Sequence, residues 1–254
     1  MEKAVGIDLG SRTTKIILMI KGKSDHEELF DTGHDPLPRV RRVLERLKPD
    51  KIVATGYGRH LVRENFGAEH VTEIRACARG AHHLFPGIRT ILDVGGQDCK
   101  LICLDEKGWV CDFEMNDRCA AGTGKFLEVM AQTFDMPLEQ FIQTALNATE
   151  PVPISSMCTV FAESEVVSLV TSGKPKEKIA LGLHAAIVSR LASMVLRFAR
   201  QGEFLFVGGG ARNRCLSQLL EKQTGKKVIV PGKPQMTVAL GAALIAQKQI
   251  SANL

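Results

Sequence analysis

Short apolar runs rich in β-branched residues alternate along the chain with amphipathic stretches, a pattern typical of α/β proteins. The first run, Ala4–Ile20, is interrupted only by a polar turn at Gly10–Arg12. Because Thr13–Ile20 is strongly β-prone, this turn leads into a second strand and not into a helix. The pattern therefore predicts an N-terminal hairpin that carries an acidic residue, Asp8, at its mouth.

Further along the chain, the same kind of pattern predicts a strand at Lys51–Thr55 that is followed by a turn at Gly56–Arg59. It also predicts a long amphipathic helix from about Lys178 to Ala199.

The same hairpin pattern returns 85 positions further along the chain. Asp8 then corresponds to Asp93 and Lys15 to Lys100, and a glycine follows two positions after each aspartate. No gap is needed to align the two segments, which indicates an internal duplication. The alternative is a pair of unrelated tight hairpins with capping aspartates.

A duplication of this kind predicts an α/β fold of two equivalent lobes, residues 1–88 plus 240–254 and residues 89–239, with a nucleotide cleft between them. Backbone N–H groups of the two turns would bind phosphates from both sides. Asp8 and Asp93 would flank Mg²⁺, directly or through its waters. Gln97 and Asp98 could orient the attacking water, and Gln97 is the first choice. The residues expected around the phosphates are Gly10, Ser11, Arg12, Thr13, Thr14, Lys15, Gly95 and Gly96.

A third glycine-rich turn follows the predicted strand Glu203–Val207. It consists of Gly208, Gly209 and Gly210, and a helix is expected from Asn213. Glycines let a flat ligand lie against the backbone, so a two-lobed phosphate binder would place adenosine here, with Asn213 among the residues that bind it. Gln235, before the last helix, either reaches the nucleotide or has a plain surface role.

Two cysteines each lie in a loop of small residues directly before an expected helix. Cys119 precedes apolar residues at helical spacing, and Cys158 precedes a helix whose apolar side is expected to carry Phe161 and Val167. The N–H groups and dipole of a helix N-terminus favour a thiolate. A P-loop is excluded around Cys119, because Phe126 stands where Ser or Thr should bind the metal.

These two thiols are half of a four-thiolate site, and a homodimer about a two-fold axis would supply the other half. Four thiolates hold a [4Fe–4S] cluster or a structural zinc ion. The competing interpretation is that both cysteines are ordinary small loop residues.

Composition indicates the cellular compartment and excludes some classes of partner, but it does not identify the reaction. No apolar run approaches the ~18 residues of a membrane helix, and Met1–Lys3 leads directly into a strand, so neither a membrane span nor a signal peptide is expected. Seven cysteines in 254 residues do not form a secreted disulfide framework, which favours a reducing cytoplasm. The net charge of +5 is modest and aromatic residues make up 5%, so no nucleic-acid surface is expected.

Residues 8–15, 93–98 and 207–210, in this order, resemble the motifs of the superfamily of acetate and sugar kinases, heat-shock ATPases and actin. The stretches 115–128 and 155–165, which contain Cys119 and Cys158, are more specific. They resemble the activators of 2-hydroxyacyl-CoA dehydratases, within the benzoyl-CoA reductase ATPase family. The resemblance covers nearly the entire chain, with one departure at Arg12, where a small residue is usual.

The resemblance implies a ribonuclease H-like, actin-like ATPase fold and a homodimer that shares one [4Fe–4S] cluster through Cys119 and Cys158 of each subunit. It also implies that hydrolysis of ATP to ADP drives one low-potential electron into a partner. That partner would be an iron–sulfur dehydratase or a double-cubane reductase, and the donor a ferredoxin or flavodoxin. The alternatives are a small-molecule kinase of the same superfamily and a zinc-bridged nucleotide-binding scaffold.

Overall fold

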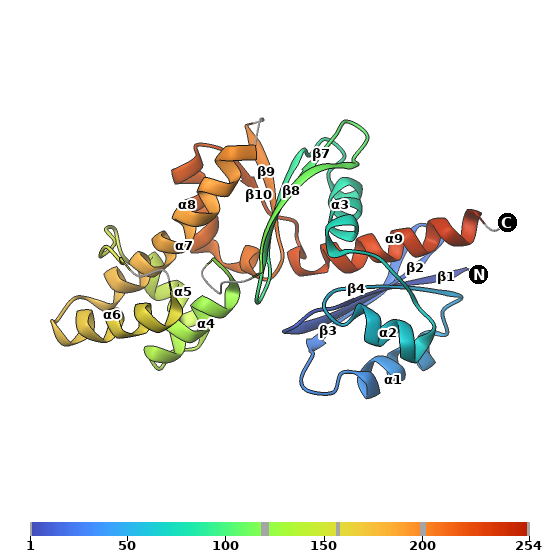
Figure 1. Cartoon of the computed structure of the whole chain (residues 1–254), viewed down its shortest axis with the longest axis horizontal. Helices are drawn as coiled ribbons and strands as arrows, with labels where there is room; N and C mark the ends of the chain where they lie inside the picture. The colour runs from blue at the N-terminus through green and yellow to red at the C-terminus, as the bar shows by residue number, and fades with distance from the viewer. Residues whose placement is uncertain (1, 118–121, 156–157, 199–201, 253–254) are drawn as a thin grey trace. The chain divides into compact units, whose positions relative to one another are not determined.

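The computed structural model describes residues 2–117, 122–155, 158–198 and 202–252. Contacts divide the chain into two compact units. Unit 1 comprises Met1–Arg89, Leu104–Asp112 and Gln235–Leu254, and unit 2 comprises Thr90–Cys103 and Phe113–Pro234. Two five-stranded mixed sheets with flanking helices account for the fold, which confirms the expected α/β class (Figure 1).

The first sheet has the strand order β3-β2-β1-β4-β5. Its strands are β1 (Lys3–Leu9), β2 (Thr13–Ile20), β3 (Lys23–Asp31), β4 (Lys51–Thr55) and β5 (Glu69–His70), and its helices are α1 (Leu37–Leu47), α2 (Arg59–Phe66), α3 (Glu73–Leu84) and α9 (Thr237–Ala252).

Successive residues of β1 point alternately to the two faces of this sheet, which are covered by different helices. Val5 and Ile7 face a core that includes Val43 of α1. Gly6 points to the opposite face, where a Cβ would lie 2.2 Å from the backbone nitrogen of Ala243 in α9. The glycine therefore lets α9 pack directly on β1, on the face opposite α1 and α2 (Figure 1).

The second sheet has the order β10-β9-β6-β7-β8. Its strands are β6 (Thr90–Val94), β7 (Cys99–Leu104), β8 (Val110–Asn116), β9 (Glu203–Val207) and β10 (Lys227–Ile229). The accompanying helices are α4 (Gly124–Thr133), α5 (Leu138–Leu146), α6 (Thr159–Thr171), α7 (Lys176–Phe198) and α8 (Arg214–Thr224), with 3-10 turns η1 (Gly210–Arg212) and η2 (Pro234–Met236).

Read from β8 to β10, the second sheet repeats the order of the first. In both sheets the first hairpin is antiparallel, and the central strand pairs in parallel with the strand that returns later in the sequence. The register agrees as well, since Asp8 faces Lys15 and Asp93 faces Lys100. The internal duplication expected from the sequence is thus present in the topology.

Helix α7 is, within the described ranges, the one helix long and apolar enough to cross a membrane by length and composition. Of its most apolar window, 67% is buried in the structure, as expected for the central helix of a core that includes Leu183, Ile187 and Leu191. Sequence analysis did not single it out because charged residues such as Arg190 interrupt the apolar run.

Candidate functional site: two glycine turns and an exposed cysteine

Hydrogen bonds within the turn and from Thr32, directly after β3, hold the turn between β1 and β2. The Gly10 nitrogen donates to the Thr13 oxygen at 3.2 Å. Thr32 donates its hydroxyl to the Gly10 oxygen at 2.8 Å and its backbone N–H to the Arg12 oxygen at 3.0 Å. Ser11 and Arg12 are exposed at the tip. The candidate phosphate turn therefore has a fixed backbone and open side chains.

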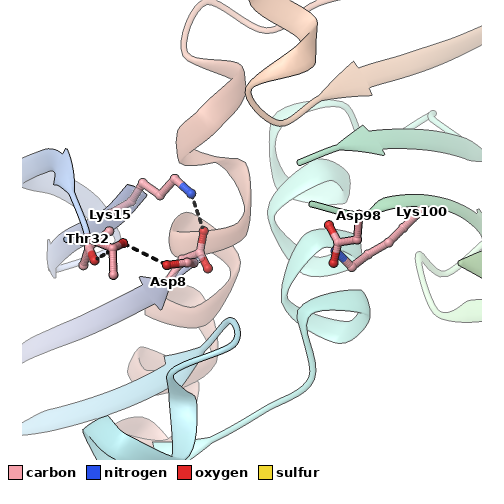
Figure 2. A network of polar contacts seen from close by, with 7 residues as sticks. Asp8, Lys15, Thr32, Asp98 and Lys100 are labelled. Carbon is pink, nitrogen blue, oxygen red and sulfur yellow. Dashed lines mark hydrogen bonds and ion pairs between the residues drawn. The ribbon is translucent and has the colours of Figure 1, made fainter. Parts of the chain in front are cut away.

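A row of polar side chains crosses the first sheet directly behind this turn. Lys15, Asp8 and Thr55 are register partners on β2, β1 and β4, so all three point to the same face. Lys15 Nζ lies 2.9 Å from Asp8 Oδ2 (Figure 2). The buried Thr55 hydroxyl has no hydrogen-bond partner in the part of the chain that the structure describes. Sequence analysis missed Thr55, although it is the one hydroxyl residue in an otherwise apolar strand end.

The turn between β6 and β7 is the counterpart in the second sheet, but its lysine takes a different acid. Gly95 N donates to Asp98 O at 2.9 Å, and Lys100 Nζ donates to Asp98 Oδ2 at 2.7 Å with both side chains buried (Figure 2). The position equivalent to Asp98 in the first turn is Thr13, which offers no carboxylate. Gln97 is exposed at the tip of the turn, where it is accessible to solvent.

The first turn of α4 is bonded to this second turn. Gly124 N donates to Gly95 O at 3.0 Å, and Lys125 N donates to Gly96 O at 2.8 Å. A helix leaves its first N–H groups without partners inside the helix, and here the turn carbonyls accept two of them. The helix that follows the Cys119 segment is therefore fixed to a candidate phosphate turn. Cys119 itself lies outside the described residues.

The glycine turn after β9 packs against the end of β6. Gly208 has a φ of +81°, and a Cβ there would lie 2.4 Å from both Asp93 Oδ1 and the Val94 oxygen. A Cβ on Gly210 would lie 2.6 Å from Val94 Cγ1. Both positions need glycine, because the backbone lies in contact with Asp93 and Val94 at Gly208 and with Val94 at Gly210.

The same arrangement recurs in unit 1, where sequence analysis expected only a plain turn. Gly56 has a φ of +90°, and its Cβ would lie 2.7 Å from Asp8 Oδ1; a Cβ on Gly58 would meet Leu9 Cδ2 at 2.3 Å. Each sheet thus ends its central strand in an aspartate covered by a glycine turn. The signal in the sequence was the spacing Gly-x-Gly after a strand, which occurs at 56–58 and 208–210.

Asn213 closes the glycine turn after β9 from inside unit 2. Its Oδ1 accepts a bond from Leu216 N at 3.1 Å, so Asn213 is the N-cap of α8. Its Nδ2 lies 3.0 Å from His184 Nε2, and His184 Nδ1 lies 2.8 Å from the Ala180 oxygen. Since a carbonyl only accepts, Nδ1 carries the proton and Nε2 accepts from Asn213. Burial lowers the pKa of His184 to about 4, which keeps the ring neutral.

Gln235 lies in η2 and is half-buried. The preceding residue, Pro234, accepts a hydrogen bond from Gly208 N at 3.1 Å. Gln235 therefore directly follows a residue that is hydrogen-bonded to the glycine turn after β9.

Cys158 is exposed at the N-cap position of α6. The segment before it is fixed by Ser155, whose backbone N–H and hydroxyl both donate to Glu165 Oε1, at 2.8 and 3.0 Å. The expected apolar face of α6 was wrong: Phe161 is 67% exposed and Val167 52% exposed, whereas Ala162 and Val166 face the core. Ala162 and Val166, four positions apart, form the inner stripe of α6, and Phe161 and Val167 fall outside this stripe.

The thiols of Cys99 and Cys215 are buried, whereas that of Cys158 is exposed. Burial raises the pKa of Cys99 to about 11 and that of Cys215 to about 12, so both remain protonated thiols inside the core. Over the described ranges, no three His, Cys, Asp or Glu side chains gather as a metal site. Of the two cysteines expected to bind a cluster, the structure describes Cys158, whose thiol is exposed and therefore accessible to a metal centre.

A duplicated α/β fold in which glycine turns cover strand-end aspartates defines the class of actin-like ATPases. Within that class, the profile of the BadF/BadG/BcrA/BcrD ATPase family matches residues 5–246, and the chain belongs to this family.

Relatives of known activity match over almost their whole length. The chain is 38% identical to the 2-hydroxyisocaproyl-CoA dehydratase activator of Clostridioides difficile, over 95% of this chain and 94% of the relative. It is 36% identical to the (R)-2-hydroxyglutaryl-CoA dehydratase activating ATPase of Acidaminococcus fermentans, over 96% and 97%. A solved structure of the activator of the 2-hydroxyisocaproyl-CoA dehydratase from Clostridium difficile, with bound ADPNP, superimposes with a TM-score of 0.91 at 36% identity, covering 99% of this chain and 96% of that one.

Proposed function

We propose that this chain is an ATP-hydrolysing activator that delivers one low-potential electron to a partner iron–sulfur protein of the dehydratase or reductase kind. The observation that carries the proposal is the pair of hydrogen bonds from Gly124 and Lys125 to Gly95 and Gly96. They join a candidate phosphate turn to the helix that follows Cys119. Similarity to two dehydratase activators along nearly the whole chain supports the same activity.

The nucleotide site of the proposal uses the two hairpin turns and the glycine turn after β9. Backbone N–H groups near Gly10 and Gly95 bind the phosphates, and the two buried aspartates, Asp8 and Asp93, hold Mg²⁺ or its waters. Gln97, which is exposed at its turn, orients the attacking water. Asp98 is excluded from that role, because its carboxylate is buried against Lys100.

The cluster site of the proposal lies between two copies of the chain. Cys119 and Cys158 of each subunit are the ligands, and a [4Fe–4S] cluster held by them would supply a one-electron redox centre. Support comes from the exposed position of Cys158 and of Phe161 one turn further along α6. A large apolar side chain with 67% of its surface exposed is stabilised when a second copy covers it.

The electron donor in this proposal is a ferredoxin or flavodoxin, the acceptor is an iron–sulfur dehydratase or reductase, and the setting is the cytoplasm. Oxidation of a reduced ferredoxin, measured with and without ATP in the presence of the protein and an iron–sulfur dehydratase, checks this part. Electron transfer at equal rates with and without ATP would contradict the coupling.

Metal analysis of anaerobically purified protein tests the proposal. We expect a brown homodimer with about four irons and four sulfides per dimer, the content of one cubane cluster. Colourless protein with zinc would favour the nucleotide-binding scaffold. Phosphorylation of an added sugar or carboxylic acid would favour the kinase.

The ligand assignment is tested with Cys158→Ser. Cys111→Ser is the matched control, because Cys111 is also an exposed thiol but lies in β8, away from a helix start. We expect Cys158→Ser to lose the iron while its ATP affinity stays within about twofold of wild type, and Cys111→Ser to keep both. Full iron content in Cys158→Ser would refute the assignment.

A further inference from the structure

His184 is a buried titratable residue that the proposed function leaves without a role. It lies within α7, is 0% exposed and stacks on Phe141 with ring centroids 5.4 Å apart. Its Nε2 accepts the hydrogen bond from Asn213 Nδ2 at 3.0 Å. This bond connects the middle of α7 to the residue that closes the glycine turn after β9.

The same part of α7 holds the segment that leads to Cys158. The oxygen of Lys178 accepts a hydrogen bond from Val152 N at 2.9 Å. One turn later, a Cβ on Gly182 would lie 2.1 Å from the Val152 oxygen and 3.2 Å from Ile154 Cγ1. The 152–154 segment therefore lies directly on the α7 backbone, with no space between them.

Asn213 and the segment before Cys158 are thus both attached to a stretch of α7 that is shorter than two helical turns. Lys178 and Gly182 contact the chain before Cys158, and His184 contacts Asn213, three residues after the glycine turn. Helix α7 runs for 23 residues without interruption, so its backbone moves as a rigid element over this short distance. A displacement of the glycine turn that keeps the Asn213 bond displaces the contact with Val152 as well.

We propose that His184 is a positioning residue that couples the glycine turn at Gly208–Gly210 to the Cys158 segment through α7. This inference rests on the proposed function, because it takes the glycine turn to contact nucleotide and Cys158 to be a cluster ligand. Nucleotide bound at the turn would then bias the position of the Cys158 segment with no direct contact between them. The coupled element is the α7 stretch from Lys178 to His184.

Four variants separate coupling from simple packing. His184→Phe keeps an aromatic ring on Phe141 but removes the acceptor for Asn213. His184→Gln restores an acceptor oxygen at the same position. Ser193→Ala is the matched control on α7, because it removes a bond from a side chain to the oxygen of Arg190 that involves neither the turn nor the Cys158 segment. Asn213→Ala removes the donor from the other side and serves as an independent variant.

The measurement is amide hydrogen exchange over residues 152–162 of the full-length protein, saturated with ADP or with ADPNP. In wild-type protein we expect the two nucleotides to change the exchange rate of this segment by about fivefold or more, the lower end of usual allosteric coupling. In His184→Phe and Asn213→Ala the ratio falls to within about twofold of one, while His184→Gln and Ser193→Ala keep the wild-type ratio.

A purely structural role for His184 predicts a different result, in which thermal unfolding shifts but the nucleotide-dependent ratio is unchanged. A wild-type ratio in His184→Phe and in Asn213→Ala, with nucleotide bound, would overturn the inference. So would equal exchange with ADP and ADPNP in wild-type protein. Neither result depends on iron, whereas the proposed function fails on iron content, so the two failures are distinguishable.

Discussion

At the scale of single residues, glycine turns lie in close contact with the aspartates near the ends of the central strands. Gly208 needs a positive φ, and its Cα also lies against Asp93 and Val94. Gly173, after α6, needs a similar φ of +77° but has nothing within 4 Å of an added Cβ. The two glycines therefore separate the cost of the backbone conformation from the cost of the contact.

We predict that Gly208→Ala destabilises the protein more than Gly173→Ala does. The control should cost about 1–2 kcal/mol for the left-handed backbone alone, which corresponds to a few degrees in Tm. Gly208→Ala should add the displacement of the Asp93 carboxylate and weaken ATP binding at least about tenfold, a loss of about 1.4 kcal/mol. Thermal unfolding and nucleotide titration measure both effects. Equal behaviour of the two variants would contradict a role for the Gly208 contact.

The sequence predicted residues that belong to a local pattern and missed those defined by a tertiary contact. Asp8 and Asp93 follow from the duplicated hairpin, and the structure places them as register partners of Lys15 and Lys100. His184 was not found, because its importance depends on Asn213, which is 29 positions away. Neither hydropathy nor motif spacing records which polar side chain a buried imidazole will meet.

At the scale of elements, the join between the second hairpin turn and α4 is the contact most directly relevant to coupling. It consists of backbone bonds, so side-chain substitution leaves it intact. Lys125 is the second residue of α4, and its N–H donates to Gly96. Proline is tolerated in the first turn of a helix, where it removes only an N–H that lacks a helical partner.

We predict that Lys125→Pro preserves the helix but impairs ATP hydrolysis, because Gly96 O loses its donor at 2.8 Å. Lys125→Ala keeps the N–H and is the control. The loss of one partly exposed backbone bond, about 0.5–1.5 kcal/mol, corresponds to a decrease in kcat of roughly 2- to 13-fold if it is expressed in the transition state. Circular dichroism verifies folding, and steady-state phosphate release measures kcat. Equal kcat in both variants would remove this join from the mechanism.

Strong periodic elements were predicted well, and short or two-sided ones were not. The helix expected near Lys178–Ala199 is α7, and the strand expected at Lys51–Thr55 is β4. The eight-residue helix α2 was missed, since the two glycines that bound it indicated only turns. The inner face of α6 was assigned to its largest apolar residues, but the core accepts Ala162 and Val166 there instead.

At the scale of the whole molecule, the outward position of Phe161 bears on assembly. An exposed side chain of this size, three residues after Cys158, is expected to be covered when two copies meet around a shared cluster. Leu61 of α2 is also an exposed apolar helix residue, at 37%, but belongs to unit 1.

We predict that Phe161→Asp weakens the proposed homodimer and that Leu61→Asp does not. A desolvated carboxylate in place of a buried phenyl ring should raise the dimer dissociation constant at least about 100-fold, or nearly 3 kcal/mol. Anaerobic sedimentation over a concentration series measures the constant, and iron content should fall with the dimer fraction. A dimer of unchanged affinity would place the interface elsewhere.

The duplicated topology explains why the class of fold could be predicted from the sequence. Two copies of one hairpin at a constant offset lead to two sheets with the same strand order. The second repeated feature, the pair of glycine turns at 56–58 and 208–210, could not be recognised from the sequence. The intervening residues, Tyr57 and Gly209, differ in size and polarity. The two turns share close packing against an aspartate of the central strand, which is visible only in the three-dimensional structure.

The packing of α9 on β1 has a consequence for biosynthesis. Gly6 leaves the ribosome more than two hundred residues before Ala243, which covers it. One apolar face of the first sheet therefore stays uncovered until α9 has been synthesised, whereas the strands and helices of unit 2 find their partners earlier. A chain truncated before α9 would leave β1 uncovered on this face and would be a substrate for chaperones and proteases.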